Sequence, residues 1–376
     1  MLDDTEQQIR ETARRYAAEQ LAPHGYDWDQ AGGCPDSVIE EMGRLGFLGL
    51  LAPEEYGGSG LSFSGFMAVM EEIAAGNGGL STLMHVHQMG TLGPIVKFGT
   101  AEQKARYIPA MARGEAIGAF LLTEPGTGSD AGAIKTRARR DGNGWILDGT
   151  KQFISNGVRA KIAIVLAVTD PEAGKRGITA FLVPTETPGY IVGRVEKKLG
   201  QRTSDTAQIM LEGCRVDGDA ILGELNRGLP LTLSLLADGR VSIAAQAVGM
   251  ASAAYEYALA YAKERVTFGV PLIEHQAVAF RLADMATQIE IARSFVMATA
   301  KKLDDGIECL KEASMAKLFA GEMAERVCSD AIQIHGGYGY LQDFPVERIY
   351  RDVRVCQIYE GTNDIQRLII ARKIAS

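Results

Sequence analysis

The stretch that decides the fold is Gly126-Thr-Gly-Ser-Asp-Ala131, followed by Ile134-Lys-Thr-Arg-Ala138. Its first half matches GxGxxG/A, the glycine pattern of dinucleotide-binding domains, which requires a helix directly after it, packed on a parallel sheet. Its second half instead alternates with period two, and the turn dipeptides Asp141-Gly142 and Asn143-Gly144 follow. A strand that leads into a hairpin argues against a dinucleotide fold. The glycines then form either a plain turn or a loop whose backbone can approach a planar or phosphorylated ligand, because glycine lacks Cβ.

Around this stretch, from residue 117 to about 216, the sequence is a series of short β-rich runs with no helix-length segment between them. Turn dipeptides Asp148-Gly149 and Asn156-Gly157 add further breaks. This pattern predicts an antiparallel barrel or sandwich rather than βαβ crossovers. The runs are Ile117–Leu122, Ile134–Arg139, Trp145–Leu147, Gln152–Ile154, Ile162–Val168, Ile178–Val183, Tyr190–Val195 and Ala207–Leu211.

Helical periodicity flanks the β-rich zone on both sides. Before it, the pattern runs from Leu2 to about Arg113, and Thr100 with Gln103 forms a capping box that starts one helix. After it, long helical patterns cover about 229–266, 274–303, 308–329 and 362–374. The prediction is an α+β multidomain chain with an all-α domain at 1–116, an antiparallel β-barrel domain at 117–226 and a C-terminal four-helix bundle at 227–376.

Charge and composition exclude several classes of function. The 376 residues carry 39 Lys plus Arg against 47 Asp plus Glu, and the basic residues do not cluster, so nucleic acid is not an expected partner. The longest apolar run, Ile162–Val168, is too short to cross a membrane. The acidic N-terminus lacks a signal peptide, so we expect a cytoplasmic protein, or one of an organelle matrix if a transit peptide has been removed. Five widely spaced cysteines predict neither disulfides nor zinc.

His85 and His87 are the first candidates for a metal site. They lie in a helical pattern, where a spacing of two points the side chains apart, and no carboxylate or cysteine lies at a useful spacing. We therefore expect them to pack or to line a pocket.

Glu360 is a sharper candidate, in Tyr359-Glu-Gly-Thr-Asn-Asp364. Thr362 suits the N-cap of the last helix. Glu360 is then either one more acid near a helix N-terminus, or a carboxylate on irregular backbone beside apolar neighbours. In the second case, bound substrate would desolvate it, raise its pKa and make it a general base.

Two longer motifs identify a family. Leu122-Thr-Glu-Pro-Gly-Thr-Gly-Ser-Asp130, and Gln333-Ile-His-Gly-Gly-Tyr-Gly-Tyr340 with Arg351-Asp-Val-Arg-Val-Cys-Gln-Ile-Tyr-Glu-Gly-Thr362, resemble the signatures of the acyl-CoA dehydrogenases. The resemblance covers the whole chain, including its helix–β–helix order. It implies FAD as cofactor and dehydrogenation of an acyl-CoA thioester to the trans-2-enoyl-CoA. Glu360 falls on the family's base position and would remove the α-proton while hydride leaves the β-carbon for flavin N5.

The resemblance also implies which groups serve the thioester and the cofactor. Negative charge develops on the thioester oxygen, which the backbone N–H of Glu360 and the FAD ribityl 2′-hydroxyl would hold. Phe153 and Ser155, two apart on a strand, would share one face toward the flavin, although Phe153 without the resemblance would be ordinary core. Arg265, whose planar fork suits a pyrophosphate, belongs to a set that would reach the FAD of a neighbouring subunit. The full FAD set is Phe120, Leu122, Thr123, Ser129, Phe153, Ser155, Arg265, Thr267, Phe268, Gln276, Gln333, Gly337, Thr362 and Asp364.

For the substrate, Ser129 and Arg240 match positions near the pantetheine and phosphate parts of CoA, while Tyr359 and Gly361 line the acyl site. One position departs from the family pattern. Ala237 stands where Asp or Asn is usual, and Asp238 would point about 100° away on a helix, so a hydrogen bond to pantetheine is in doubt.

Within the family, Glu360 argues against the isovaleryl-CoA dehydrogenase branch, whose base sits on the long helix. Ser81 aligns with an arginine of glutaryl-CoA dehydrogenases, so a dicarboxylic substrate is disfavoured. The segment 84–91 favours a short, branched or small cyclic acyl group. The resemblance implies a homotetramer, as a dimer of dimers, and electron-transferring flavoprotein as acceptor. The alternatives are an acyl-CoA oxidase, disfavoured by the modest length, a sulfinyl-CoA desulfinase, or a non-catalytic acyl-CoA-binding flavoprotein.

Overall fold

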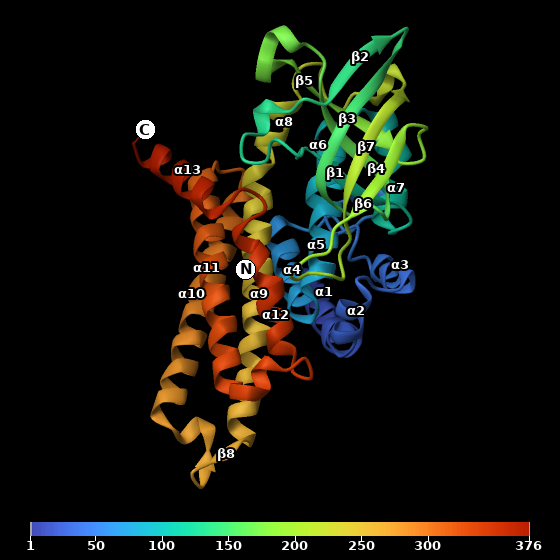
Figure 1. Ribbon diagram of the computed structural model, residues 1–376. Helices are drawn as coiled ribbons and strands as arrows, with labels where there is room; N and C mark the ends of the chain where they lie inside the picture. Colours follow the sequence, from blue (N-terminus) through green and yellow to red (C-terminus); the bar gives the residue numbers. More distant parts are fainter. Residues whose placement is uncertain (1, 376) are drawn as a thin grey trace.

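The computed structural model describes residues 2–375, and Figure 1 shows three regions in chain order: a group of helices, a sheet, and a bundle of long helices. The first region contains two π-helical turns, at Ala17–Leu21 and Val86–Leu92. The predicted capping box is confirmed, because Thr100 Oγ1 accepts from Gln103 N (3.2 Å) and Gln103 Oε1 accepts from Thr100 N (3.0 Å). The helices are α1 Asp4–Tyr16, α2 Gly25–Ala31, α3 Asp36–Arg44, α4 Phe63–Gly76, α5 Gly78–His85, α6 Gly93–Phe98 and α7 Ala101–Ala112.

The middle region is a seven-stranded sheet in the order β1-β4-β2-β3-β7-β6, with β5 paired to β4. Most of its ladders are antiparallel, as expected, but β4 pairs in parallel with β1 and, at Arg137 and Val168, with β2. Only a single 3-10 turn, Ala131–Ala133, follows the glycine-rich stretch before β2, so the long helix that a dinucleotide fold requires is not present there. The strands are β1 Ile117–Leu121, β2 Arg137–Asp141, β3 Gly144–Ser155, β4 Ala160–Val168, β5 Ile178–Pro184, β6 Tyr190–Val195 and β7 Thr206–Val216.

Strand β4 shows why an unbroken apolar run can form a strand here. Ala163, Val165 and Ala167 face the core between the strands. The alternate residues Ile162, Ile164 and Leu166 belong to a second hydrophobic cluster, which also contains residues of α6 and of α7, and the loop that follows α7 packs against it. Both faces of the strand are therefore buried, which explains the lack of polar alternation.

Two local predictions in the sheet were wrong. Asp148-Gly149 is not a turn but lies inside β3, where a register shift between Leu147 and Gly149 accommodates it as a bulge. The strand expected from residue 134 begins only at Arg137. The reason is Glu124, whose carboxylate accepts from the backbone N–H groups of Lys135 (2.6 Å) and Thr136 (2.9 Å), so these groups are lost to the ladder.

The last region is built on three long helices that run side by side in Figure 1, α9 Leu236–Glu264, α10 Gln276–Asp304 and α11 Leu310–His335. A break at Leu235 separates α9 from α8 Gly228–Ser234, where the sequence predicted one helix. Helix α12 Pro345–Val353 was not predicted from the sequence pattern. The hairpin β8 Val266–Thr267 with β9 Val270–Pro271 lies at the end of the bundle away from the sheet, and α13 Asn363–Ala375 closes the chain.

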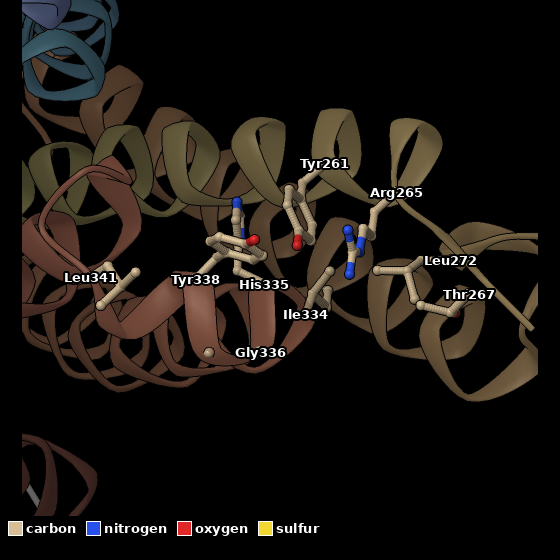
Figure 2. A pocket seen from close by; sticks show the side chains of 10 residues that line it. Tyr261, Arg265, Thr267, Leu272, Ile334, His335, Gly336, Tyr338 and Leu341 are labelled. Carbon is tan, nitrogen blue, oxygen red and sulfur yellow. The ribbon is translucent and has the colours of Figure 1, made fainter.

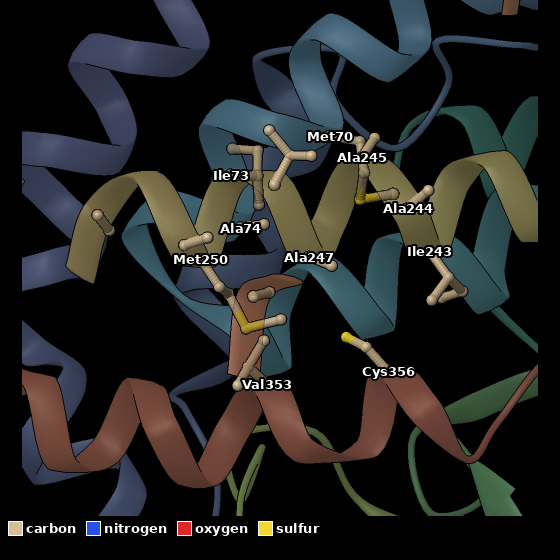
Figure 3. Close-up of a cluster of buried hydrophobic side chains, with 14 of the residues drawn as sticks. Met70, Ile73, Ala74, Ile243, Ala244, Ala245, Ala247, Met250, Val353 and Cys356 are labelled. Atoms are coloured by element: carbon tan, nitrogen blue, oxygen red, sulfur yellow. The ribbon is translucent and has the colours of Figure 1, made fainter. Parts of the chain in front are cut away.

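The two helical regions share one hydrophobic core. Figure 3 shows Met70 of α4 beside Ala245 of α9, and Cys356, from the far end of the chain, on the opposite side of α9 near Ala247; all four belong to one hydrophobic cluster. All five cysteines are unpaired and buried, which confirms the expectation that they form no disulfide. The sheet therefore projects from a helical body to which the first and last parts of the sequence both contribute.

Within residues 2–375, no helix is both long and apolar enough to cross a membrane.

Candidate active site

Glu360 lies on the short connection between α12 and α13, on strained backbone. Its φ is +52°, in the left-handed region that residues other than glycine rarely adopt, and Gly361 follows with φ +85°. The connection is held from two sides: Lys317 Nζ donates to Gly361 O (2.7 Å), and Gln366 Nε2 donates to Glu360 O (3.1 Å). The carboxylate is thus presented on irregular backbone that its neighbours fix in place.

The backbone N–H of Glu360 has no acceptor among the described residues, whereas Ile358 N and Tyr359 N both donate to Val355 O. A free N–H beside the carboxylate is available to a ligand oxygen. This is the donor that the family resemblance implies for the thioester oxygen.

Three positively charged or hydrogen-bonding side chains surround the Glu360 carboxylate. His85 Nε2 lies 3.4 Å from Oε1. Burial alone would raise the pKa of Glu360, but the hydrogen bond and electrostatic interaction with His85, together with the charges of Arg240 and Lys317, outweigh it and lower the pKa below its ordinary value. Without ligand, the group is therefore a carboxylate at neutral pH, as a base must be.

Helix α9 packs against Glu360 through a glycine. A Cβ on Gly239 would lie 2.8 Å from Oε2 of Glu360 and 3.2 Å from its Cδ. The carboxylate thus occupies the space that any larger residue at position 239 would need.

Arg240, the next residue on α9, is only 2% exposed. Its Nη1 lies 3.4 Å from Ser314 Oγ, and its Nε has no hydrogen-bond partner in the described structure. Burial lowers its pKa, and Glu360 opposes that shift. This burial disfavours the expected contact with the phosphate part of CoA, because the charge of Arg240 acts on Glu360 instead.

Tyr359 points into a buried polar cluster. Its hydroxyl donates to Gln246 Oε1, accepts from Gln201 Nε2 (3.3 Å) and lies 3.4 Å from Thr82 Oγ1. Burial raises its pKa well above the ordinary value. Tyr359 therefore anchors the backbone next to Glu360, whatever it contributes to an acyl site.

The expected flavin residues of the sheet meet where β1 ends beside β3. Thr123 O accepts from Gln152 N (2.8 Å), and Lys151 Nζ donates to Leu122 O (3.2 Å) and to the Glu124 carboxylate (2.9 Å). The Lys151–Glu124 ion pair is buried, and burial lowers the pKa of Lys151 to about 8. This pair fixes the loop that carries Leu122 and Thr123, with Phe120 on β1 partly buried beside it.

Phe153 is not ordinary core. It has φ +59°, lies at a register shift of β3, and leaves 64% of its surface exposed, whereas Ser155 is half-buried. The register shift therefore interrupts the regular alternation of side chains between the two faces of β3 at residues 153 to 155. An exposed aromatic ring on strained backbone, beside a loop fixed by a buried ion pair, suits contact with the planar ring of FAD. A Cβ on Gly126 or Gly128 would meet no atom within 4 Å, so this loop leaves open space for a ligand.

A second group of expected FAD residues lies at the other end of the bundle, near the β8–β9 hairpin (Figure 1). Arg265, Thr267 and Gly337 line a pocket of about 420 Å³. Figure 2 shows Arg265 beside Tyr261 and Tyr338, and the guanidinium lies 5.9 Å from the centre of the Tyr338 ring. Phe268 is 98% exposed, and Gln276 and Gln333 are exposed as well. Within one chain this group does not meet Glu360 or the loop after β1.

At the start of α13, Thr362 Oγ1 accepts from Ile365 N (3.4 Å), so the predicted cap is confirmed. Asp364 is exposed, and its Oδ1 lies 3.6 Å from Nη1 of Arg367. Ser129 is exposed on the loop after β1.

The sequence pattern did not predict that His85 and Lys317 lie beside the connection that carries Glu360. We expected His85 to pack or to line a pocket rather than to bind a metal, and no signal in the sequence indicated that it lies beside Glu360. His87 packs as expected, accepting from Gly118 N (3.1 Å) and facing the carbonyls of Leu48 and Met111. In the part of the chain that the structure describes, no group of three or more His, Cys, Asp or Glu could hold a metal ion.

Comparison with known proteins places this geometry in a family. Models of the N-terminal, middle and C-terminal domains of acyl-CoA dehydrogenases match residues 3–115, 119–214 and 226–375. The human mitochondrial short-chain specific acyl-CoA dehydrogenase is 44% identical over 98% of this chain and 90% of its own length. Butyryl-CoA dehydrogenase from Megasphaera elsdenii has a TM-score of 0.98 and 37% identity, covering 100% of this chain and 99% of its own.

A chain in the solved structure concerning the electron transferring flavoprotein of Acidaminococcus fermentans has the same TM-score of 0.98, with 40% identity over 100% of this chain and 98% of its own.

Proposed function

The chain belongs to the acyl-CoA dehydrogenase family, and from this premise we propose that it oxidises short-chain acyl-CoA thioesters with Glu360 as the base. It is an FAD-dependent acyl-CoA dehydrogenase and belongs to the flavoprotein oxidoreductases that act in fatty acid β-oxidation. The single observation that carries the catalytic assignment is the ionised, fixed carboxylate of Glu360 beside a free backbone N–H.

The role of each residue follows from its chemistry. The thioester oxygen accepts a hydrogen bond from the N–H of Glu360, which stabilises the negative charge that develops there. Bound substrate removes water from the carboxylate, which raises its pKa and makes it a stronger acceptor for the α-proton. Bound FAD would supply the acceptor for the hydride that leaves the β-carbon. Phe120, Leu122, Thr123, Phe153 and Ser155 would hold its ring, and Arg265 with its neighbours at the hairpin end would serve the cofactor of another subunit.

The proposal of a short acyl group rests on the relatives and on the residues that stand near Glu360. The human relative is named short-chain specific and the M. elsdenii relative acts on butyryl-CoA. Ser81 is fully buried and donates to Gly78 O (2.8 Å), so the described site offers no cation there for a dicarboxylic substrate. Met84 and Met89 are buried on the same segment. Branched and small cyclic groups are the next candidates.

We also propose domain limits at 1–116, 117–226 and 227–376, an electron-transferring flavoprotein as acceptor, a location in the cytoplasm or an organelle matrix, and a homotetramer formed as a dimer of dimers. Exposed Phe280 (64%) and Ile291 (54%) on α10 support self-association of the bundle. Light scattering after size-exclusion chromatography tests the tetramer.

The test of function mixes the holoenzyme anaerobically with butyryl-, isobutyryl- and hexanoyl-CoA while the flavin absorbance is followed. We expect bleaching with butyryl-CoA, slow reoxidation by air and fast reoxidation by electron-transferring flavoprotein. Glu360→Gln should retain FAD and lose the bleaching. Normal turnover of that variant would refute the assignment of the base.

The same experiment separates the alternatives. Prompt formation of peroxide would indicate an oxidase, and release of sulfite from a sulfinyl thioester a desulfinase. Binding of acyl-CoA without any bleaching would indicate a non-catalytic flavoprotein.

A further inference from the structure

The strongest feature without an assigned role is a chain of hydrogen-bonding side chains that runs from buried Ser242 through buried His85 to the carboxylate of Glu360, whose side chain is 31% exposed. His85 is the last residue of α5 and is 3% exposed. Its Nδ1 lies 3.0 Å from Ser242 Oγ on α9, and its Nε2 lies 3.4 Å from Glu360 Oε1. The π-helical turn Val86–Leu92 begins directly after it, and such turns are frequent at functional sites.

The tautomer of His85 follows from its partners. Ser242 is fully buried, and His85 Nδ1 is the one hydrogen-bond partner of its hydroxyl in the described chain. A buried hydroxyl is expected to donate its proton, so Ser242 donates to Nδ1. The ring proton of neutral His85 is then on Nε2, which faces a carboxylate that can only accept.

Other ionisable groups act on Glu360 without contacting its carboxylate oxygens. From α11, Lys317 donates to Gly361 O and Asn363 Oδ1. From α9, Arg240 lies against Ser314. Tyr359, on the connection itself, turns its hydroxyl toward Gln246, and burial keeps it neutral. Among residues 2–375, His85 is therefore the one side chain that donates a hydrogen bond to the carboxylate.

We propose that His85 is a positioning residue that holds the Glu360 carboxylate ionised and oriented toward the α-carbon, with Ser242 fixing the imidazole tautomer. This inference rests on the proposed role of Glu360 as base. The proton that leaves the α-carbon ends on Glu360, and His85 donates its hydrogen bond without being consumed. Since the donor favours the charged form, it extends proton abstraction to lower pH.

The test is the pH profile of kcat/KM of the holoenzyme with butyryl-CoA. His85→Leu removes a hydrogen bond to a charged group, so the acid limb of the profile should move up by about one pH unit. At pH values below the limb, kcat/KM should therefore fall by about tenfold relative to wild type. His85→Gln places an N–H near Nε2 and should restore most of the shift. Ser242→Ala should cause a smaller shift in the same direction and none in the His85→Leu background.

Infrared titration of the Glu360 carboxyl in the ligand-free holoenzyme, with Glu360→Gln as the subtraction reference, gives a readout that a loss of packing would not move. The matched control is His87→Gln, a neighbouring histidine that faces backbone carbonyls. The proposal would be overturned if the acid limb of the kcat/KM profile stayed in place in His85→Leu, or if it shifted equally in His87→Gln. If Glu360→Gln still bleaches, the base assignment has failed; if it is inactive while the His85 variants match wild type, only the role of His85 has failed.

Discussion

Gly239→Ala is the substitution whose effect can best be worked out from the geometry. The added Cβ would lie 2.8 Å from Glu360 Oε2, whereas ordinary contacts begin at 3.4 Å, so the oxygen must move by about 0.6 Å. The backbone of Glu360 cannot follow freely, because Lys317 and Gln366 hold the carbonyls of the connection. The carboxylate must therefore rotate away from its orientation toward the substrate.

A misplacement of about 1 Å costs about 100-fold in rate, so we expect a loss of about 10- to 100-fold in the rate of flavin bleaching by butyryl-CoA. Anaerobic stopped-flow absorbance measures this rate. Thermal stability should change little, because alanine is favoured over glycine in a helix by about 1 kcal/mol, which offsets the crowding.

Gly321→Ala on α11 is the matched control. Its new Cβ would meet nothing closer than 3.4 Å, so the helix gains the same residue without contact with Glu360. A Gly239→Ala enzyme that bleaches as fast as wild type, or a Gly321→Ala enzyme that is equally slow, would refute the reasoning.

Other predictions concern burial and the cofactor. Burial lowers the pKa of His87 to about 4 from 6.5, so the unfolded chain binds more protons between these values and stability is lost as the pH falls from 6.5 to 4. The loss should reach about 3 kcal/mol, and chemical denaturation of His87→Gln should show a flatter pH dependence. Lys151→Met leaves the buried Glu124 carboxylate without its cation, so it should cost about 3 kcal/mol by the same denaturation assay and release FAD, seen as free flavin fluorescence. Arg265→Ala should weaken FAD retention in the oligomer while the infrared signal of Glu360 is unchanged; tight retention would contradict a role at the cofactor.

The sequence predicted the helix–β–helix order because periodicity changes sharply at about residues 117 and 216. It failed where a side chain competes with the backbone: Glu124 captures the amides of residues 135 and 136 and delays β2. Glu360 was found because glycine and a capping threonine follow it. The surroundings of Glu360 were not predictable, because His85, Gly239 and Lys317 come from three helices far apart in the sequence, and only their packing brings them together.

The common core of the first and last helical regions has a consequence for how the chain is made. Side chains of α4 find their partners on α9, which leaves the ribosome about 160 residues after α4 ends. The apolar surface of the early helices therefore stays exposed while the sheet is synthesised. Long-range contacts of this kind slow folding and favour aggregation. Nascent chains halted before residue 236 should be the species that chaperones hold, and truncated genes should yield insoluble product.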